Sequence, residues 1–294
     1  SFRIDTQPGS LRVITATDNG SPTLLSATST FNIKGDITLI WPNSGKVTSI
    51  VTVIGRGYYG SVTIGFGTMV SITTTTAEND GTFSTTFLVN TQSWGSKVIS
   101  AGDSNGSYTV VWFTLLGRIT QVNPANSRFG DIVTVIGDGY HGTETISIDF
   151  VLNQTITTAV GNSNGTFSIT FRVDSQAYGS KAITVRGLFS GQIETIIAFT
   201  ILPRIILVAP ETQWIGRLLT VEGVGYGTNS TIRIDFGTHQ TITTTISSLD
   251  GTFSVTFLVS TQPYSTKQIT AMDLRENVND VTQVARVRIR ATIY

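Results

Sequence analysis

Alternation of apolar and polar residues is the dominant pattern of this chain, and it recurs along the sequence. In the segment Asp250–Val259, Phe253, Phe257 and Val259 fall on one side of an extended chain, and Ser and Thr fall on the other. A period of two residues predicts a β-strand with one buried face. The Asp-Gly pair that opens the segment favours the positive φ angles of a two-residue hairpin turn.

The same segment occurs three times. Its copies begin at Asp80, Asn164 and Asp250, which are 84 and then 86 residues apart. A recurring distance of this size indicates a tandem array of one structural unit. We expect complete units over residues 36–117, 118–203 and 204–294.

Residues 1–35 align with the second half of a unit. The stretch Phe2–Pro8 matches the stretch that begins at Phe87, and Thr28–Ile33 matches the closing strand Thr109–Thr114. A half-sandwich exposes unpaired strand edges and half of a core. We therefore expect this half-unit to be completed by strands of another chain or by a preceding segment of the same polypeptide.

Turn residues divide each unit into about seven short strands. Turn signals about every 8–12 residues, without a sustained period of 3.6, are typical of an immunoglobulin-like β-sandwich. The predicted fold class is all-β, as an elongated array of tandem sandwich domains. The linkers Leu116–Arg118 and Leu202–Arg204 are so short that neighbouring domains should meet at a restrained angle.

Three motifs carry a resemblance to the IPT/TIG type of immunoglobulin-like domain. They are an opening Pro42, the stretch Val51–Tyr58 with its Gly-x-Gly-Tyr turn, and the strand Ile64–Gly67. The first two recur as Pro124 with Val133–Tyr140 and as Pro210 with Leu219–Tyr226. The second half of each unit is similar to repeats of large surface and S-layer-like proteins of prokaryotes. The resemblance implies the fold but not one function, because such domains occur in receptors, adhesins, transcription factors and carbohydrate-active enzymes.

Composition narrows the function classes. The net charge is zero and 13% of the residues are charged, about half of the usual share, so nothing predicts binding to nucleic acid. The chain has no Cys, which removes disulfides and thiolate metal sites. No apolar run reaches the ~18 residues of a membrane span. Because the chain does not begin with Met, we expect its true N-terminus to lie upstream.

Few residues are candidates for chemistry, and we expect no enzymatic activity. A dinucleotide loop needs a helix after its glycines, but a strand follows each Gly-x-Gly-Tyr turn. Tyr58, Tyr140 and Tyr226 are therefore predicted to pack over the end of each sandwich. His141 and His239 occupy different places in their units and are predicted to be surface loop residues without a catalytic partner.

Acidic residues raise the alternative of bound calcium, although no cofactor is expected. Asp149 and Asp235 take the same place in their units, where the first unit has Gly65. A second set follows a shared strand and comprises Asp18, Asp103 and Asp273. The carboxylates are not clustered as a calcium site requires, so turn capping is the favoured interpretation.

Tryptophan side chains can form platforms for sugar rings. Trp94 shares its position with Tyr178 and Tyr264, and Trp112 lies in a closing strand, so packing is the favoured role of both. Trp41 and Trp214 flank the opening prolines, where we expect interdomain packing.

Five Asn-x-Ser/Thr sequons are candidate glycosylation sites. They lie at Asn19, Asn105, Asn153, Asn164 and Asn229. Asn164 belongs to a predicted hairpin turn, where a sugar would interfere least with the fold.

The favoured function is that of a structural protein of the cell surface. Tandem repeats, low charge, absence of Cys and short linkers suit a segment that builds a surface layer, sheath or extracellular filament by self-association. The expected partner is another copy of the chain, in a homo-oligomer, lattice or filament. One alternative is an adhesin stalk or a carbohydrate- or protein-binding module. Another is the accessory region of a secreted carbohydrate-active enzyme.

Overall fold

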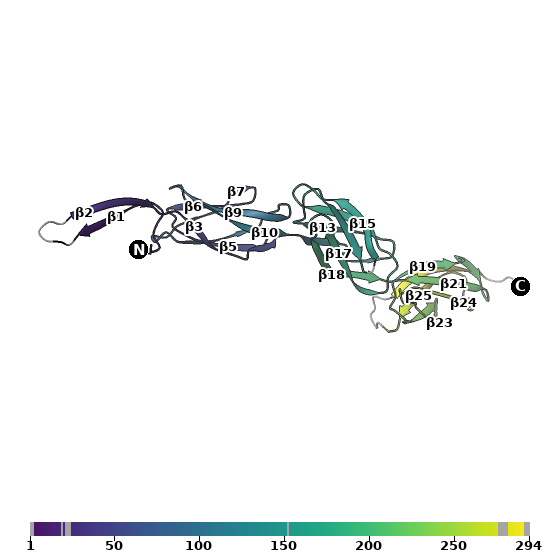
Figure 1. Cartoon of the computed structure of the whole chain (residues 1–294). Helices are drawn as coiled ribbons and strands as arrows, with labels where there is room; N and C mark the ends of the chain where they lie inside the picture. Colours follow the sequence, from purple (N-terminus) through teal and green to yellow (C-terminus); the bar gives the residue numbers. More distant parts are fainter. Residues whose placement is uncertain (1–2, 19, 21–24, 152, 276–281, 291–294) are drawn as a thin grey trace.

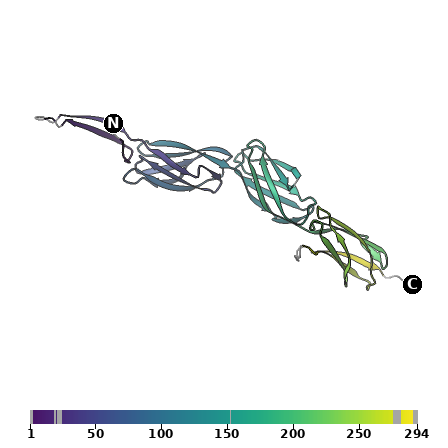
Figure 2. The same ribbon diagram turned by 60° about the horizontal axis from the view of Figure 1, so that its bottom comes forward.

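The computed structural model describes residues 3–18, 20, 25–151, 153–275 and 282–290. All regular structure in these residues is β, which confirms the predicted all-β class. Three sandwiches follow one another in an elongated row, and a thin two-stranded ribbon extends from the N-terminal end of the row (Figures 1 and 2). No helix long and apolar enough to cross a bilayer is formed by the described residues.

The first complete repeat contains eight strands in two sheets. In chain order they are β3 (Asp36–Trp41), β4 (Ser44–Lys46), β5 (Ile50–Arg56), β6 (Ser61–Phe66), β7 (Met69–Thr76), β8 (Phe83–Leu88), β9 (Gly95–Asp103) and β10 (Tyr108–Leu116). One sheet has the order β3-β5-β8, and the other has the order β4-β10-β9-β6-β7. The two sheets face each other across one hydrophobic core.

The second and third repeats reproduce this order strand for strand. The second repeat consists of β11 (Arg118–Asn123), β12 (Asn126–Arg128), β13 (Ile132–Asp138), β14 (Thr145–Phe150), β15 (Asn153–Val160), β16 (Phe167–Arg172), β17 (Gly179–Gly187) and β18 (Ile193–Leu202). The third consists of β19 (Arg204–Ala209), β20 (Thr212–Trp214), β21 (Leu218–Val224), β22 (Thr231–Phe236), β23 (His239–Ile246), β24 (Phe253–Leu258), β25 (Thr266–Asp273) and β26 (Thr282–Arg290).

The strand count of eight differs from the predicted seven because the opening strand is divided. Pro42 lies between β3 and β4 and lacks the N–H that a continuous ladder would need. Before it, β3 pairs antiparallel with β5 of the small sheet. After it, β4 pairs in parallel with the closing strand β10 of the large sheet. The opening segment therefore joins both sheets.

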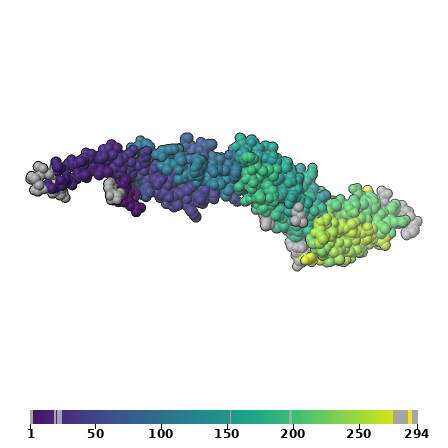
Figure 3. All heavy atoms as spheres, viewed as in Figure 1, coloured from purple at the N-terminus to yellow at the C-terminus, as the bar shows by residue number. Residues whose placement is uncertain are grey.

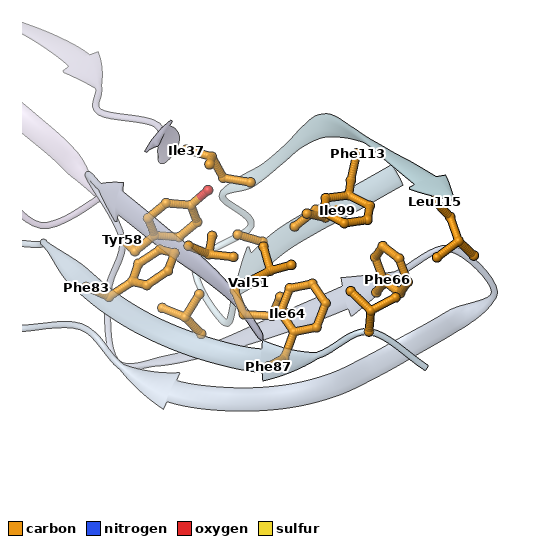
Figure 4. Packing of buried hydrophobic residues seen from close by; sticks show 14 of the residues in the cluster. Ile37, Val51, Tyr58, Ile64, Phe66, Phe83, Phe87, Ile99, Phe113 and Leu115 are labelled. Carbon is orange, nitrogen blue, oxygen red and sulfur yellow. The ribbon is translucent and has the colours of Figure 1, made fainter. Parts of the chain in front are cut away.

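The core of each repeat is built by the alternation that the sequence displays. In the first repeat Phe83, Phe87 and Val89 point inward and are almost fully buried. Figure 4 shows Phe66 between Phe87 and Phe113, with ring centroids 5.3 and 5.6 Å from theirs. Full burial of each such side chain stabilises a sandwich by roughly 1.5–3 kcal/mol.

The N-terminal ribbon consists of β1 (Leu11–Asp18) and β2 (Leu25–Asn32), which pair only with each other among the described residues. Arg12 lies opposite Phe31, as Lys97 lies opposite Phe113 in the first complete repeat. Phe31 therefore corresponds to Phe113, and the predicted alignment of Thr28–Ile33 is wrong by one residue. A slip of one residue transfers every side chain to the other face, so the correction decides which face of the ribbon is the inner one.

Candidate functional site

A buried tyrosine closes the N-terminal end of each complete repeat. Tyr58, Tyr140 and Tyr226 are fully buried, which confirms their predicted packing role. Each ring packs edge-on against the phenylalanine that opens the hairpin strand, with centroid distances of 5.1, 5.2 and 5.0 Å. Burial raises the pKa of the Tyr140 and Tyr226 hydroxyls above its ordinary value.

The linker from the preceding repeat lies directly on this tyrosine. A Cβ atom at Gly117 would lie 2.9 Å from the ring of Tyr140, and one at Gly35 would lie 2.6 Å from the ring of Tyr58. Real Cβ atoms do not approach so closely, so at these two junctions the close packing of linker and ring requires glycine. Pro203 takes this place before the third repeat. The linker is thus held against the domain that follows it.

The hairpin turn of each repeat packs against the repeat before it. A Cβ at Gly165 would lie 2.7 Å from the Cα of Ser93, and one at Gly251 would lie 2.7 Å from the Cα of Ala177. At the ribbon, the equivalent Gly81 faces the Cα of Pro8 at the same distance. All three glycines have positive φ angles. The Asp-Gly and Asn-Gly pairs therefore form both the turn and the contact between domains.

Backbone hydrogen bonds fix the contact. The Trp94 N–H donates to the carbonyl oxygen of Tyr140 at 2.8 Å, and the Tyr178 N–H donates to that of Tyr226 at 2.9 Å. At the ribbon the corresponding residue is Gly9, whose carbonyl accepts a 3.1 Å hydrogen bond from Asn105 Nδ2. Each of the two junctions between complete repeats thus contains an equivalent hydrogen bond. A different hydrogen bond holds the ribbon at the same position.

Basic side chains at the start of a repeat reach back to the one before it. Arg118 donates to both carboxylate oxygens of Asp138 at 2.9 and 3.1 Å and to Thr48 Oγ1 at 2.9 Å. At the next junction Arg204 donates to the Phe129 carbonyl at 2.9 Å. Thr48 has a φ of +68°, an unusual backbone for a β-branched residue, at the position where it meets Arg118.

An ion pair also crosses the first of these junctions. Lys46 Nζ lies 2.7 Å from Glu194 Oε1, so a short strand of the first repeat is tied to the closing strand of the second. Because both side chains are partly exposed, the pair adds on the order of 1 kcal/mol or less. The pair therefore helps to orient the two repeats but adds little to the stability of the junction.

A glutamine clamp holds the segment that follows the hairpin strand in the first and third repeats. Gln92 is buried, and its Nε2 donates to the Phe66 carbonyl at 3.1 Å while its Oε1 accepts the Thr68 N–H at 3.1 Å. Gln262 makes the same contacts with Phe236 and Thr238. The sequence shows the repeated Gln, but its role depends on a turn 24 residues away along the chain. Only the structure identifies it.

The inner face of the ribbon carries core residues that are exposed. Ile14 corresponds to Ile99 through the shared ladder, and it is 37% exposed whereas Ile99 is fully buried. Phe31 corresponds to the fully buried Phe113 and is only half-buried. A hollow of about 350 Å³ lies over this face and is lined by Ile4, Ile14 and Phe31, among others. The ribbon therefore presents half of a core.

Two tryptophans that were predicted to pack are exposed instead. Trp112 is 65% exposed on the outer face of the large sheet, so its predicted packing role is wrong. Trp41 is 70% exposed, which contradicts interdomain packing for that residue. Trp214 is 41% exposed. Trp94 is half-buried beside the next repeat, in agreement with its predicted packing role.

His141 belongs to the junction and is not an isolated surface residue. Its ring lies between Trp94, at 6.4 Å, and Phe189, at 4.5 Å between ring centroids. Its backbone N–H donates to the buried Glu144 at 2.6 Å. The prediction of a surface loop holds for His239, which is exposed at the start of β23.

The acidic residues bind protein donors. Asp149 accepts from Arg186 Nε at 2.5 Å and from the Thr155 N–H at 2.9 Å. Asp235 makes the same kind of contacts with Arg233 and the Thr241 N–H. The carboxylates of Asp18, Asp103 and Asp273 accept backbone N–H groups in loops. No group of three or more metal-ligating side chains is present in the described part of the chain.

The four described sequon asparagines are exposed, but their side chains differ. Asn105 Nδ2 donates to Gly9 at the ribbon junction, and Asn153 Nδ2 donates to Asp174. Asn164 Oδ1 accepts hydrogen bonds from the backbone N–H and the hydroxyl of Thr166, in a turn that packs against the preceding repeat. Asn229 lies in a separate exposed loop of the third repeat. Asn19 lies outside the described residues.

Comparison with known proteins identifies no family. No family model matches the chain, and no curated protein does. Among solved structures, an ICAM-5 D1-D4 ectodomain fragment has a TM-score of 0.25 at 11% identity, covering 88% of this chain and 77% of that one. Invasin, a bacterial integrin-binding protein, has a TM-score of 0.27 at 13% identity, covering 95% and 65%. A Ca2+-stabilized, ice-binding adhesin of an Antarctic bacterium has a TM-score of 0.22 at 12% identity, covering 97% and 82%.

Proposed function

We propose that the chain is a structural segment of an extended cell-surface array, in which sandwich domains are joined end to end at a fixed angle. The observation that carries the proposal is the repeated junction. The turn glycines Gly81, Gly165 and Gly251 each pack against the segment before them, and backbone hydrogen bonds join the complete repeats. Domains connected only by a flexible linker would move independently.

The work assigned to the array is mechanical, with no catalytic step. Antiparallel ladders run along each sandwich, and the linkers are seated on buried tyrosines, so a pull on the two ends is borne by many backbone hydrogen bonds in parallel. A hydroxyl-rich chain of low charge suits an extracellular location. In the full proposal such arrays associate into a surface layer, sheath or filament.

The ribbon suggests how the array continues. Its exposed inner face needs the strands that correspond to residues 36–88 of the first repeat. In the described chain each such front half is already paired with its own back half, so a second copy in this conformation has none to donate. We propose that a front half from outside the described residues completes the ribbon, either from the same polypeptide or from a neighbouring chain.

Electron microscopy of the purified chain and of the cells that make it tests the array. The expected images are stiff rods at high dilution, and on cells an ordered layer or filament that antibodies to the chain decorate. Rods with freely varying bends, or decoration confined to the cell interior, contradict the proposal.

Complementation tests the ribbon. A second copy of residues 36–88 is fused ahead of the ribbon in one protein and added as a separate polypeptide in another experiment. Completion is expected to protect the amides of β1 and β2 from hydrogen exchange. Protection in the fused protein alone would indicate that the front half comes from the same chain. Protection in both experiments would indicate that a neighbouring chain can supply it. Absence of protection in both experiments contradicts completion by a front half, and leaves the junction argument intact.

A further inference from the structure

The outer face of the large sheet differs between the repeats. In the second repeat an ion pair between Asp149 and Arg186 crosses it, and in the third Asp235 pairs with Arg233. In the first repeat glycines take the places of both Asp149 and Arg186, namely Gly65 and Gly102. The charges that cover this face elsewhere are therefore absent from the first repeat.

An aromatic stripe occupies the uncovered face. Tyr108, Val110 and Trp112 alternate along β10 on its outer side and are 68%, 44% and 65% exposed. Successive residues on one face of a strand are ~7 Å apart, so the two rings are separated by ~13 Å along the strand. Strand β4 pairs only with Thr114–Leu116, which leaves the stripe at the margin of the sheet.

The strands beside the stripe present small, uncharged side chains on this face, a surface that we call the floor. Tyr108, Val110 and Trp112 lie opposite Gly102, Ser100 and Val98 of β9, and the next strands add Gly65, Thr63 and Thr74. The strands β6, β7 and β10 contain no charged residue. On β9, Lys97 lies in register with the core residue Phe113, and Asp103 accepts loop N–H groups.

We propose that this face of the first repeat binds a neutral polysaccharide chain. Aromatic rings in line offer π-faces to the C–H-bearing faces of successive sugar rings, and the Ser and Thr hydroxyls of the floor can exchange hydrogen bonds with sugar hydroxyls. The absence of charge beside the stripe matches an uncharged ligand, because no ion has to be desolvated without a partner. Lys46 of β4, which lies on this face beyond Trp112, is paired with Glu194. The centre of a protein–protein interface is more apolar than this surface of Gly, Ser and Thr. The inference is independent of how the repeats are joined.

Affinity electrophoresis and calorimetry with soluble β-1,3/1,4-glucan, galactomannan and, as a polyanion, dextran sulfate test the proposal. The chain is expected to bind at least one of the two neutral polymers and not to bind dextran sulfate. Trp112→Ala is expected to weaken binding by at least about ten-fold. Both rings are exposed, so Trp112→Ala and Tyr108→Ala should keep the melting temperature of the parent chain, which scanning calorimetry checks.

Ile193→Ala is the matched control. Ile193 lies opposite Arg186 as Tyr108 lies opposite Gly102, so it occupies the same register on the charged face of the second repeat. Its substitution should leave binding unchanged. The proposal is overturned if neither neutral polymer binds, if Trp112→Ala binds as well as the parent, or if Trp112→Ala instead abolishes self-association, which would make the face a contact between copies.

Discussion

The backbone N–H of Trp94 donates a hydrogen bond to the carbonyl oxygen of Tyr140, which lies in the next repeat. Tyr178 and Tyr226 repeat the relationship one junction later. Because both partners are backbone groups, the bond does not depend on the side chains Trp94 and Tyr178, which differ. The bond requires two backbone segments to approach each other closely, and the turn glycines allow that approach.

Replacement of a turn glycine should loosen a junction. In Gly165→Ala the new Cβ would meet Ser93 Cα and the Tyr140 carbonyl oxygen, in addition to the cost of a side chain at positive φ, ~1–2 kcal/mol. Small-angle scattering should show a broader distribution of end-to-end lengths. Gly191→Ala is the control, since Gly191 also has positive φ but open space around it. Equal broadening in both variants would show that the junction contact does not restrain the angle.

Loss of the glutamine clamp should destabilise the first repeat. Gln92→Ala removes hydrogen bonds to Phe66 and Thr68 and leaves the buried Phe66 carbonyl without its partner, at a cost of ~1–3 kcal/mol. Hydrogen exchange of the β6–β7 turn should accelerate accordingly. In the second repeat Gln176 is half-buried, and within the described residues its side chain donates to Asp174, at 3.3 Å, and not to the Phe150 carbonyl. Gln176→Ala should therefore have a smaller effect, and an equal one would argue against the clamp.

Stability should fall in alkaline solution because of the buried tyrosines. Burial raises the pKa of Tyr226 in the folded chain, so above the ordinary pKa of ~10 the unfolded chain loses this proton while the folded chain keeps it. The unfolded state then binds fewer protons, and the free energy of unfolding decreases as pH rises beyond that value. Urea titrations at pH 8 to 11 measure the slope, which Tyr226→Phe should reduce. A slope that Tyr226→Phe leaves unchanged would contradict this origin of the pH dependence.

Glycosylation, where the host provides it, should favour Asn229 over Asn105. The Nδ2 atom of Asn105 is engaged with Gly9 at the ribbon junction, and a glycan on that atom would displace the contact. Asn229 lies in an exposed loop, and its described hydrogen bond uses its backbone N–H. Peptide mapping after expression in a glycosylating host measures the two occupancies. Higher occupancy at Asn105 would mean that the ribbon contact forms after glycan transfer or not at all.

Most of the fold could be predicted from the sequence because most strands have one apolar face. The spacing of Phe83, Phe87 and Val89 fixes which side of β8 is buried, and the structure agrees. The register of β2 was not predictable in the same way. Its residues are nearly all small or polar, so a shift of one residue hardly changes the pattern, and the predicted alignment misplaces Phe31 by one residue.

The candidate sites were less predictable, because they depend on what lies across a sheet or across a junction. Trp112 in a closing strand suggested packing, yet the two faces of β10 carry apolar residues alike, and only the ladder shows that Phe113 points inward. Similarly, nothing near Gln92 in the sequence indicates the turn that it holds. The missing information is long-range in both cases.

The first and second repeats each carry both halves of the junction: a turn glycine at one end and, at the other, the segment on which the next turn rests. A duplicated repeat would therefore fit between its neighbours without any new complementary surface having to evolve. Unequal recombination within the gene could lengthen or shorten the protein in steps of one domain while every boundary kept its geometry. The reach of such a molecule would then be a heritable variable, set by copy number instead of by point mutation.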